Sequence, residues 1–276
     1  MINQMIVSIL GTGNAGFRLA ISLKGAGISV SAVVNRSIDS ARQLSSILNK
    51  PEYNPHKLAD TPFSCDHLIM DGSDIIFVSV SDDSLVQVLP TLKVIPSVIT
   101  GHTTVCHISG ATSLEVLSEF PSYGVFFPMM TLSKNKPVDM KIVPFLLEAS
   151  DSKALDKLTS ICRQMSSEFS VSDSSERLKM HVATVFVSDF FNYLAALSYD
   201  IASNHHVYLL PQAIETVRKA FLYGDPAMMQ TGPSSRGDIT TIQKHLEVLK
   251  GMKEHYVVYE MLSNFIVEQT KIHKKG

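Results

Sequence analysis

The residues best placed for chemistry near the start of the chain are three glycines in the pattern G-x-G-x-x-G. They belong to the run Gly11-Thr12-Gly13-Asn14-Ala15-Gly16, which follows a short apolar segment and opens a helix-like one. In this pattern the first glycine permits a tight turn, the second lets the backbone approach a pyrophosphate, and the third allows close packing of helix on strand. The helix N-terminus offers N–H groups and a positive dipole end to the phosphates. The motif predicts a dinucleotide site; the alternative is a glycine turn in an α/β domain without a ligand.

The residues after the second apolar segment favour one nicotinamide cofactor over the other. The run is Val34-Asn35-Arg36-Ser37, and no carboxylate follows until Asp39. An acidic side chain here would accept hydrogen bonds from the adenosine ribose of NAD. Asn35 and Ser37 can instead donate to a 2′-phosphate, and Arg36 can pair with it through two N–H groups. NADP(H) is therefore expected, unless Arg36 is an ordinary solvated arginine.

The ends of two later strands are expected to reach the same crevice. They are the runs Ser79-Val80-Ser81 and His107-Ile108-Ser109-Gly110. Open α/β sheets bind ligands at the carboxyl ends of their strands, so the backbone of the first run should follow the cofactor. Ser109 and Gly110 are candidate neighbours of the nicotinamide or the substrate.

A candidate proton donor lies in the second half of the chain. His181, Ser188 and Asn192 are spaced so that, at about 100° per residue, they share one stripe of an unbroken helix. An imidazole titrates near neutrality and can protonate a carbonyl oxygen or imine nitrogen as hydride arrives. His181 and Asn192 are therefore candidate catalytic residues. The alternative is a histidine that is bonded to backbone in the core or faces water.

A cation in a turn-rich segment is a second candidate. Arg236 stands between Gly232-Pro233 and Asp238, and Asp238 is expected to cap a helix over 239–249. The forked guanidinium of Arg236 could hold a substrate carboxylate or an acidic side chain of a partner subunit.

These candidates depend on alternating strands and helices in the first part of the chain. Short apolar runs predict strands, and segments with helical spacing lie between them. This alternation predicts an α/β fold with a Rossmann-like, doubly wound parallel sheet. The expected strands cover 5–10, 29–34 and 74–80, with further strands inside 97–109 and 143–148; the expected helices cover 15–24, 39–48 and 84–89, the last capped by Asp82 and Asp83.

Only helical signals follow residue 173. Asp173-Ser174-Ser175-Glu176 resembles a capping box ahead of a pattern that runs to about 202. Further helices are expected over 210–223, 239–249 and 252–271. The organisation predicted is an NADP-binding domain over 1–172 and an all-α substrate and dimerisation domain over 173–276.

Composition excludes several classes of protein. The 276 residues carry 24 Lys and Arg against 26 Asp and Glu, a net charge of −2 that is unlike the basic surface of nucleic-acid binders. Cys65, Cys106 and Cys162 lack metal-type spacing, so no metal site is expected and a reduced compartment fits them. No uninterrupted apolar run approaches a membrane span, and the start lacks the features of a signal peptide. A cytoplasmic protein is expected.

The combined motifs resemble a family of bacterial proteins regarded as NADP oxidoreductases, with a Rossmann-like N-terminal domain and a helical C-terminal domain of unknown function. The plan is similar to that of ketopantoate reductase, pyrroline-5-carboxylate reductase and 6-phosphogluconate dehydrogenase. The resemblance implies a helical domain that closes the cleft and forms a homodimer. We expect hydride transfer with a small substrate held between Ser109, Pro128 and the stripe of His181 and Asn192. The resemblance rests on the glycine run, 35–37, 107–110, Gly124-Val125-Phe126-Phe127-Pro128-Met129, Thr231-Gly232-Pro233 and Arg236-Gly237-Asp238.

Two departures from these families concern the reaction. Many relatives have a histidine where this chain has Phe127, and the related hydroxyacid dehydrogenases place an asparagine four residues after a lysine, where Lys179 is followed by Ala183. The expected function is an NADP-dependent oxidoreductase acting on a small, anionic oxo or imino compound. The alternative is a non-catalytic NADP-binding or sensing module with a protein partner.

Overall fold

An eight-stranded sheet with the strand order β3-β2-β1-β4-β5-β6-β7-β8 organises the first part of the chain. The structure is a computed structural model that describes residues 5–273, so the first four residues, on which part of the signal-peptide expectation rests, lie outside it. All pairings are parallel except that of β6 with β7. The Rossmann-like prediction is confirmed, with one antiparallel pairing added. The strands are β1 (Ile6–Leu10), β2 (Ser29–Val34), β3 (Phe63–Ser64), β4 (Ile75–Val78), β5 (Thr104–His107), β6 (Tyr123–Pro128), β7 (Phe145–Ala149) and β8 (Phe169–Val171).

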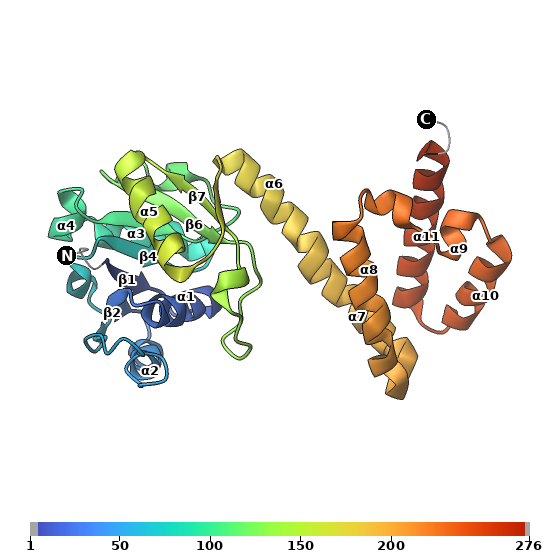
Figure 1. Cartoon of the computed structure of the whole chain (residues 1–276), viewed down its shortest axis with the longest axis horizontal. Coiled ribbons are helices and arrows are strands. Elements are labelled where there is room, and N and C mark those ends of the chain that lie inside the picture. Colours follow the sequence, from blue (N-terminus) through green and yellow to red (C-terminus); the bar gives the residue numbers. More distant parts are fainter. Residues whose placement is uncertain (1–4, 274–276) are drawn as a thin grey trace. The chain divides into compact units, whose positions relative to one another are not determined.

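Helices cover both faces of this sheet (Figure 1). One buried cluster joins the sheet to α1 (Asn14–Gly25), α2 (Ile38–Leu48) and α5 (Ser152–Met165). A second cluster on the other face involves α3 (Asp82–Leu92) and α4 (Pro96–Ile99). Strands covered on both faces need apolar residues at every position, which explains why all four residues of β4 are buried.

The remaining structure is helical. Asp173 accepts a hydrogen bond from the Glu176 N–H (2.7 Å) and Asp238 one from the Thr241 N–H (3.1 Å), which confirms both predicted caps. The α-helices are α6 (Ser174–Val185), α7 (Phe191–Ala202), α8 (Leu210–Leu222), α9 (Pro233–Arg236), α10 (Ile239–Leu249) and α11 (Lys253–His273). A π-helical turn covers Phe186–Phe190, and short 3-10 helices cover His67–Met70 (η1), Leu114–Leu117, Met140–Ile142, Ser203–Leu209 and Pro226–Met229.

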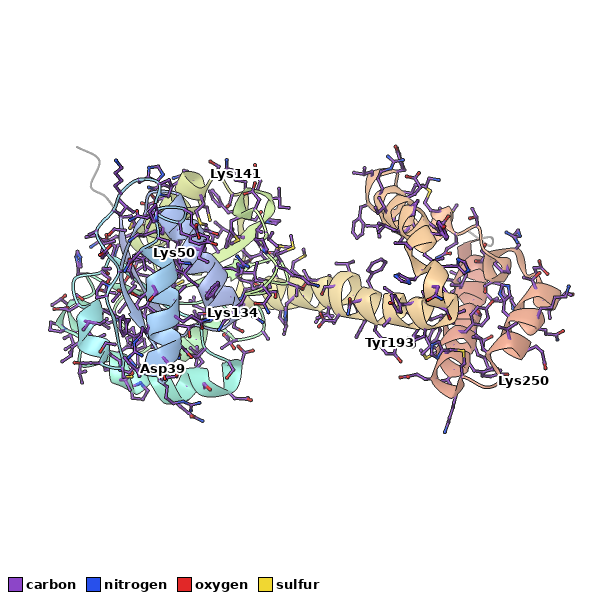
Figure 2. All side chains as sticks on the ribbon, turned by 90° about the horizontal axis from the view of Figure 1, so that it is seen from below. Asp39, Lys50, Lys134, Lys141, Tyr193 and Lys250 are labelled. Carbon is purple, nitrogen blue, oxygen red and sulfur yellow. The ribbon has the colours of Figure 1, made fainter. Side chains whose placement is uncertain are left out.

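The chain divides into two compact units, Met1–Ser188 and Asp189–Gly276. The sequence prediction placed the domain limit at 172/173, where the alternation of strands and helices ends, and β8 is indeed the last strand of the described residues. Within the second unit, the Tyr193 hydroxyl donates to Glu254 and so links α7 to α11 (Tyr193 is labelled in Figure 2).

One helical stretch, Ser174–Leu222, is long and apolar enough to cross a membrane by length and composition alone. Only 6% of its most apolar window is buried. The stretch also carries Arg177, His181, Asp189 and Asp200, and ionisable groups inside a membrane are costly. A single such stretch is therefore weak evidence for a membrane span.

Candidate cofactor and substrate site

The glycine run forms a turn with no room for larger residues at two of its three glycines. Gly11 has φ +99°, and a Cβ there would lie 2.3 Å from the Ser79 carbonyl oxygen. A Cβ on Gly16 would lie 2.5 Å from both the Gly11 oxygen and the Ser79 Oγ. At Gly13 the nearest atom would be 3.8 Å away, so this residue leaves open space beside the N-terminus of α1. A diphosphate needs a backbone that it can approach closely beside a helix N-terminus, so these residues fit a dinucleotide.

The turn between β2 and α2 presents donors rather than carboxylates. Arg36 is exposed, and the Asn35 side-chain amide donates to the Ser37 carbonyl oxygen (3.3 Å). Ser37 is the N-cap of α2, where its Oγ accepts a hydrogen bond from the Ser40 N–H. Asp39, labelled near the N-terminal end of α2 in Figure 2, pairs with Arg42 at 2.8 Å. The first carboxylate after β2 is therefore already held by a cation.

A cleft of about 560 Å³ joins the glycine turn to Arg36. It contains the predicted backbone run Ser79-Val80-Ser81. Sequence reasoning missed one wall of it, a face of α3 whose spacing of three and four residues could have shown it. It also missed two residues that follow β3, a strand too short to give an apolar signal. The missed residues are Ser84, Gln87, Val88 and Thr91 on α3, and Cys65 and His67 after β3.

The start of α3 differs from the prediction. Ser81 is the N-cap residue and the helix begins at Asp82, so Asp82 and Asp83 occupy the first turn and do not cap a helix at 84–89. Carboxylates in a first turn are stabilised by the helix dipole, which explains their position without a cap. The Ser81 hydroxyl donates to the Ser84 Oγ (2.9 Å).

The loop after β5 is held by side chains on both of its sides. His107 is buried, and its Nδ1 accepts the Ser109 N–H (3.2 Å). The Ser109 Oγ accepts the N–H groups of Ala111 (3.1 Å) and Thr112 (3.0 Å). The oxygen of Ser109 therefore serves the turn, while its hydroxyl hydrogen can still donate. Burial, more than the nearby Arg177 charge, lowers the pKa of His107 to about 4 and keeps it neutral.

Gly110 brings this loop against His181. A Cβ on Gly110 would lie 2.7 Å from the Phe127 ring and 2.9 Å from the His181 ring. The two rings meet edge to face with centroids 5.6 Å apart. Pro128 ends β6 next to Phe127 and is buried. The structure thus brings together Gly110, Phe127 and His181 at the carboxyl ends of β5 and β6, and the predicted residues Ser109 and Pro128 are their neighbours in sequence.

Arg177, which sequence reasoning missed, joins α6 to the same loop. Its buried guanidinium pairs with Glu148 on β7 and donates to the Thr112 carbonyl oxygen (2.7 Å) and the Ser174 Oγ (3.1 Å). Glu148 also accepts the Ser174 N–H (3.1 Å) and hydroxyl (2.8 Å). Because His181 is one turn after Arg177, this pair also positions the histidine. The sequence contains one sign of this role: a charged side chain at position 177 falls on the face of the helix that packs against the core.

The predicted stripe on the long helix is altered by the π-helical turn. Ser188 lies in that turn, and its hydroxyl donates to the Thr184 carbonyl oxygen (2.7 Å). A π turn holds more residues than an α turn, so the 100° arithmetic fails between His181 and Asn192. Asn192 is exposed on α7 in the second unit. Its catalytic role stays a prediction.

Arg236 also belongs to the second unit, where it is exposed and donates to the Thr231 carbonyl oxygen of its own turn. Its role as a carboxylate clamp stays a prediction. Within residues 5–273, no group of three or more His, Cys, Asp or Glu side chains is arranged to hold a metal ion.

Comparisons with known proteins identify one family model and several solved structures that are similar to this chain. Residues 143–266 match the family model of a domain of unknown function, DUF2520. The chain is similar to a "putative NADP oxidoreductase" from Bacteroides fragilis, with 28% identity over 97% of this chain and 100% of that one and a TM-score of 0.83. No curated protein matches the sequence at a significant level. The expected resemblance to NADP oxidoreductases of this plan is confirmed.

More distant structures share the fold. A protein from Thermotoga maritima is 21% identical over 97% of this chain and 99% of its own, with a TM-score of 0.65. The pyrroline carboxylate reductase of Plasmodium falciparum, whose structure contains NADP, is 13% identical over 96% of this chain and 100% of its own, with a TM-score of 0.58.

Proposed function

We propose that this protein is a cytoplasmic oxidoreductase that transfers hydride between NADPH and a small, anionic oxo or imino compound. The observation that carries the proposal is the cleft that joins the glycine turn to Arg36, with open space at Gly13 and no carboxylate among its described lining residues. The residues that would hold the cofactor are Gly11–Gly16, Asn35–Ser37 and Ser79–Ser81. When bound, the nicotinamide supplies hydride. The residues of the chain bind the cofactor, orient it against the substrate and supply a proton.

The binding half of the proposal is tested by Arg36→Ala. Arg36 would contact only the 2′-phosphate end, so the variant should bind NADPH much more weakly and NADH almost as before. Titration calorimetry on protein freed of carried-over cofactor measures both affinities. Arg163→Ala, which removes an exposed arginine of α5, is the matched control. Equal losses for NADPH and NADH would contradict the assignment.

His181 is proposed as the general acid, since it lies beside Gly110 at the carboxyl ends of the central strands. No described residue makes a hydrogen bond to its ring nitrogens, so they are available to a substrate. NADPH oxidation with a panel of keto acids and cyclic imines identifies a substrate. His181→Ala should then abolish turnover and leave NADPH affinity unchanged. Tight NADPH binding without turnover of any compound would favour the sensing module instead.

We also propose a homodimer formed through the helical region. The second unit exposes many large apolar side chains, and exposed surfaces of this kind mark interfaces. Light scattering should give twice the chain mass, and Phe221→Asp should reduce it to a monomer. Val86→Asp, an equally exposed position in the first unit, should stay dimeric; a monomeric wild type would refute this part. Examples of the exposed side chains are Val207, Tyr208, Leu210, Phe221, Leu222, Met228, Val248 and Phe265.

A further inference from the structure

The cleft that contains Arg36 is also lined by a second turn, which follows β3. β3 pairs with β2, and the Asn35 N–H donates to the Ser64 carbonyl oxygen (3.2 Å). The Cys65 thiol lies 3.6 Å from the Arg36 carbonyl oxygen, to which it donates a weak hydrogen bond. The turn that carries Cys65 and His67 is thereby held against the turn that carries Arg36. Both Arg36 and His67 line the cleft.

The surroundings of His67 favour its neutral form when no ligand is bound. Its side chain is half-buried, and burial lowers its pKa, against the opposing effect of Asp66. The Asp66 carboxylate accepts the Leu68 N–H (2.9 Å) and caps η1. From the other walls of the cleft, the β2–α2 turn contributes the charge of Arg36, and α3 contributes uncharged side chains. An anion at this end would therefore find one fixed cation and one base able to take up a proton.

We propose that His67 is a second ligand of the adenosine 2′-phosphate beside Arg36, and that it takes up a proton from solvent when NADP(H) binds. This inference rests on the proposed function, because it assumes that the cleft holds NADP(H). It adds a specificity-determining residue from η1, the 3-10 helix after β3, which plays no part in the glycine motif. It also makes the preference for NADPH over NADH depend on pH.

The direction of this dependence follows from the charges. The second pKa of a phosphate monoester is about 6, so the 2′-phosphate is mainly dianionic above pH 7 and takes up little of the proton itself. A dianion beside His67 favours the imidazolium, so binding takes up protons from solvent. NADPH affinity should then fall about tenfold per pH unit over the interval in which the proton is taken up. NADH has no 2′-phosphate, and its affinity should hardly change.

Titration calorimetry in buffers of different ionisation enthalpy counts the protons directly. We expect net proton uptake per NADPH at pH 7, almost none per NADH, and almost none per NADPH for His67→Gln. His56→Gln, an exposed histidine bonded to the Gly25 carbonyl oxygen, should behave as the wild type. Circular dichroism checks that both variants are folded.

The outcomes separate the two proposals. NADPH binding by the wild type without proton uptake overturns the role of His67 and leaves the proposed function standing. Uptake that persists in His67→Gln does the same, because another group must then take the proton. Failure of the wild type to bind NADPH at all overturns both.

Discussion

The buried ion pair between Arg177 and Glu148 should be a main determinant of the stability of the first unit. The Arg177 side chain is 1% exposed and that of Glu148 is 16% exposed. Arg177→Met leaves the Glu148 carboxylate in the interior without its cation, and it also removes the donor to the Thr112 carbonyl oxygen. An uncompensated buried charge is costly, so this change should destabilise the unit strongly.

The size of the effect follows from the groups that remain. Breaking a buried pair costs roughly 3–5 kcal/mol. Ser174 still donates two hydrogen bonds to Glu148, which places the cost in the lower part of that range, at about 3–4 kcal/mol. A unit of this length loses about 2–4 °C of Tm per kcal/mol, so we expect a fall of roughly 6–16 °C. Adding Glu148→Leu removes the stranded charge and should recover part of the loss.

The cysteines allow the unfolding of the first unit to be measured separately from that of the second. All three lie within it, and Cys106 and Cys162 are buried. In a Cys65→Ser background, their reaction with a thiol reagent during heating therefore reports unfolding of the first unit only. Lys93→Met, which breaks the exposed pair with Glu119, is the control and should hardly change the midpoint. A midpoint for Arg177→Met within about 2 °C of that control would refute this reasoning.

Three further predictions follow from the same unit. Gly110→Ala should lower the Tm, because its Cβ would lie 2.7 Å from the Phe127 ring, whereas Gly25→Ala, with no atom within 4 Å, should raise it slightly; equal effects in differential scanning fluorimetry would contradict this. His107 has a folded pKa of about 4 against 6.5 in the unfolded chain, so stability should be complete above pH 6.5 and fall by about 3 kcal/mol between pH 6.5 and 4. Urea unfolding of His107→Gln should show a weaker acid dependence, and an unchanged slope would contradict the assignment. In the native wild type only Cys65 should react quickly with a thiol reagent, and saturating NADPH should slow that reaction; no protection would place the cofactor elsewhere.

The glycine motif and the sheet could be predicted because their signals are local. A tight turn needs Gly11, and strands buried on both faces need continuous apolar runs such as β4. Capping residues placed α6 and α10 to within a residue of their starts, since one side chain satisfies a specific N–H group. The residues of the glycine run and of the β2–α2 turn could be proposed as cofactor ligands because their signals are local too.

The features that were not predicted depend on contacts between distant segments. β3 has two residues and exists because β2 offers it an edge, so His67 could not be placed in the cleft from its neighbours in sequence. The pairing of Arg177 with Glu148 joins residues 29 positions apart. The π-helical turn inserts extra residues into a helix whose apolar pattern is otherwise continuous, and the spacing of His181 and Asn192 does not reveal it.

The three buried apolar clusters draw all their fully buried members from residues before position 166. The buried members of these clusters therefore all belong to the first unit. A substitution in the second unit therefore removes no member of these clusters.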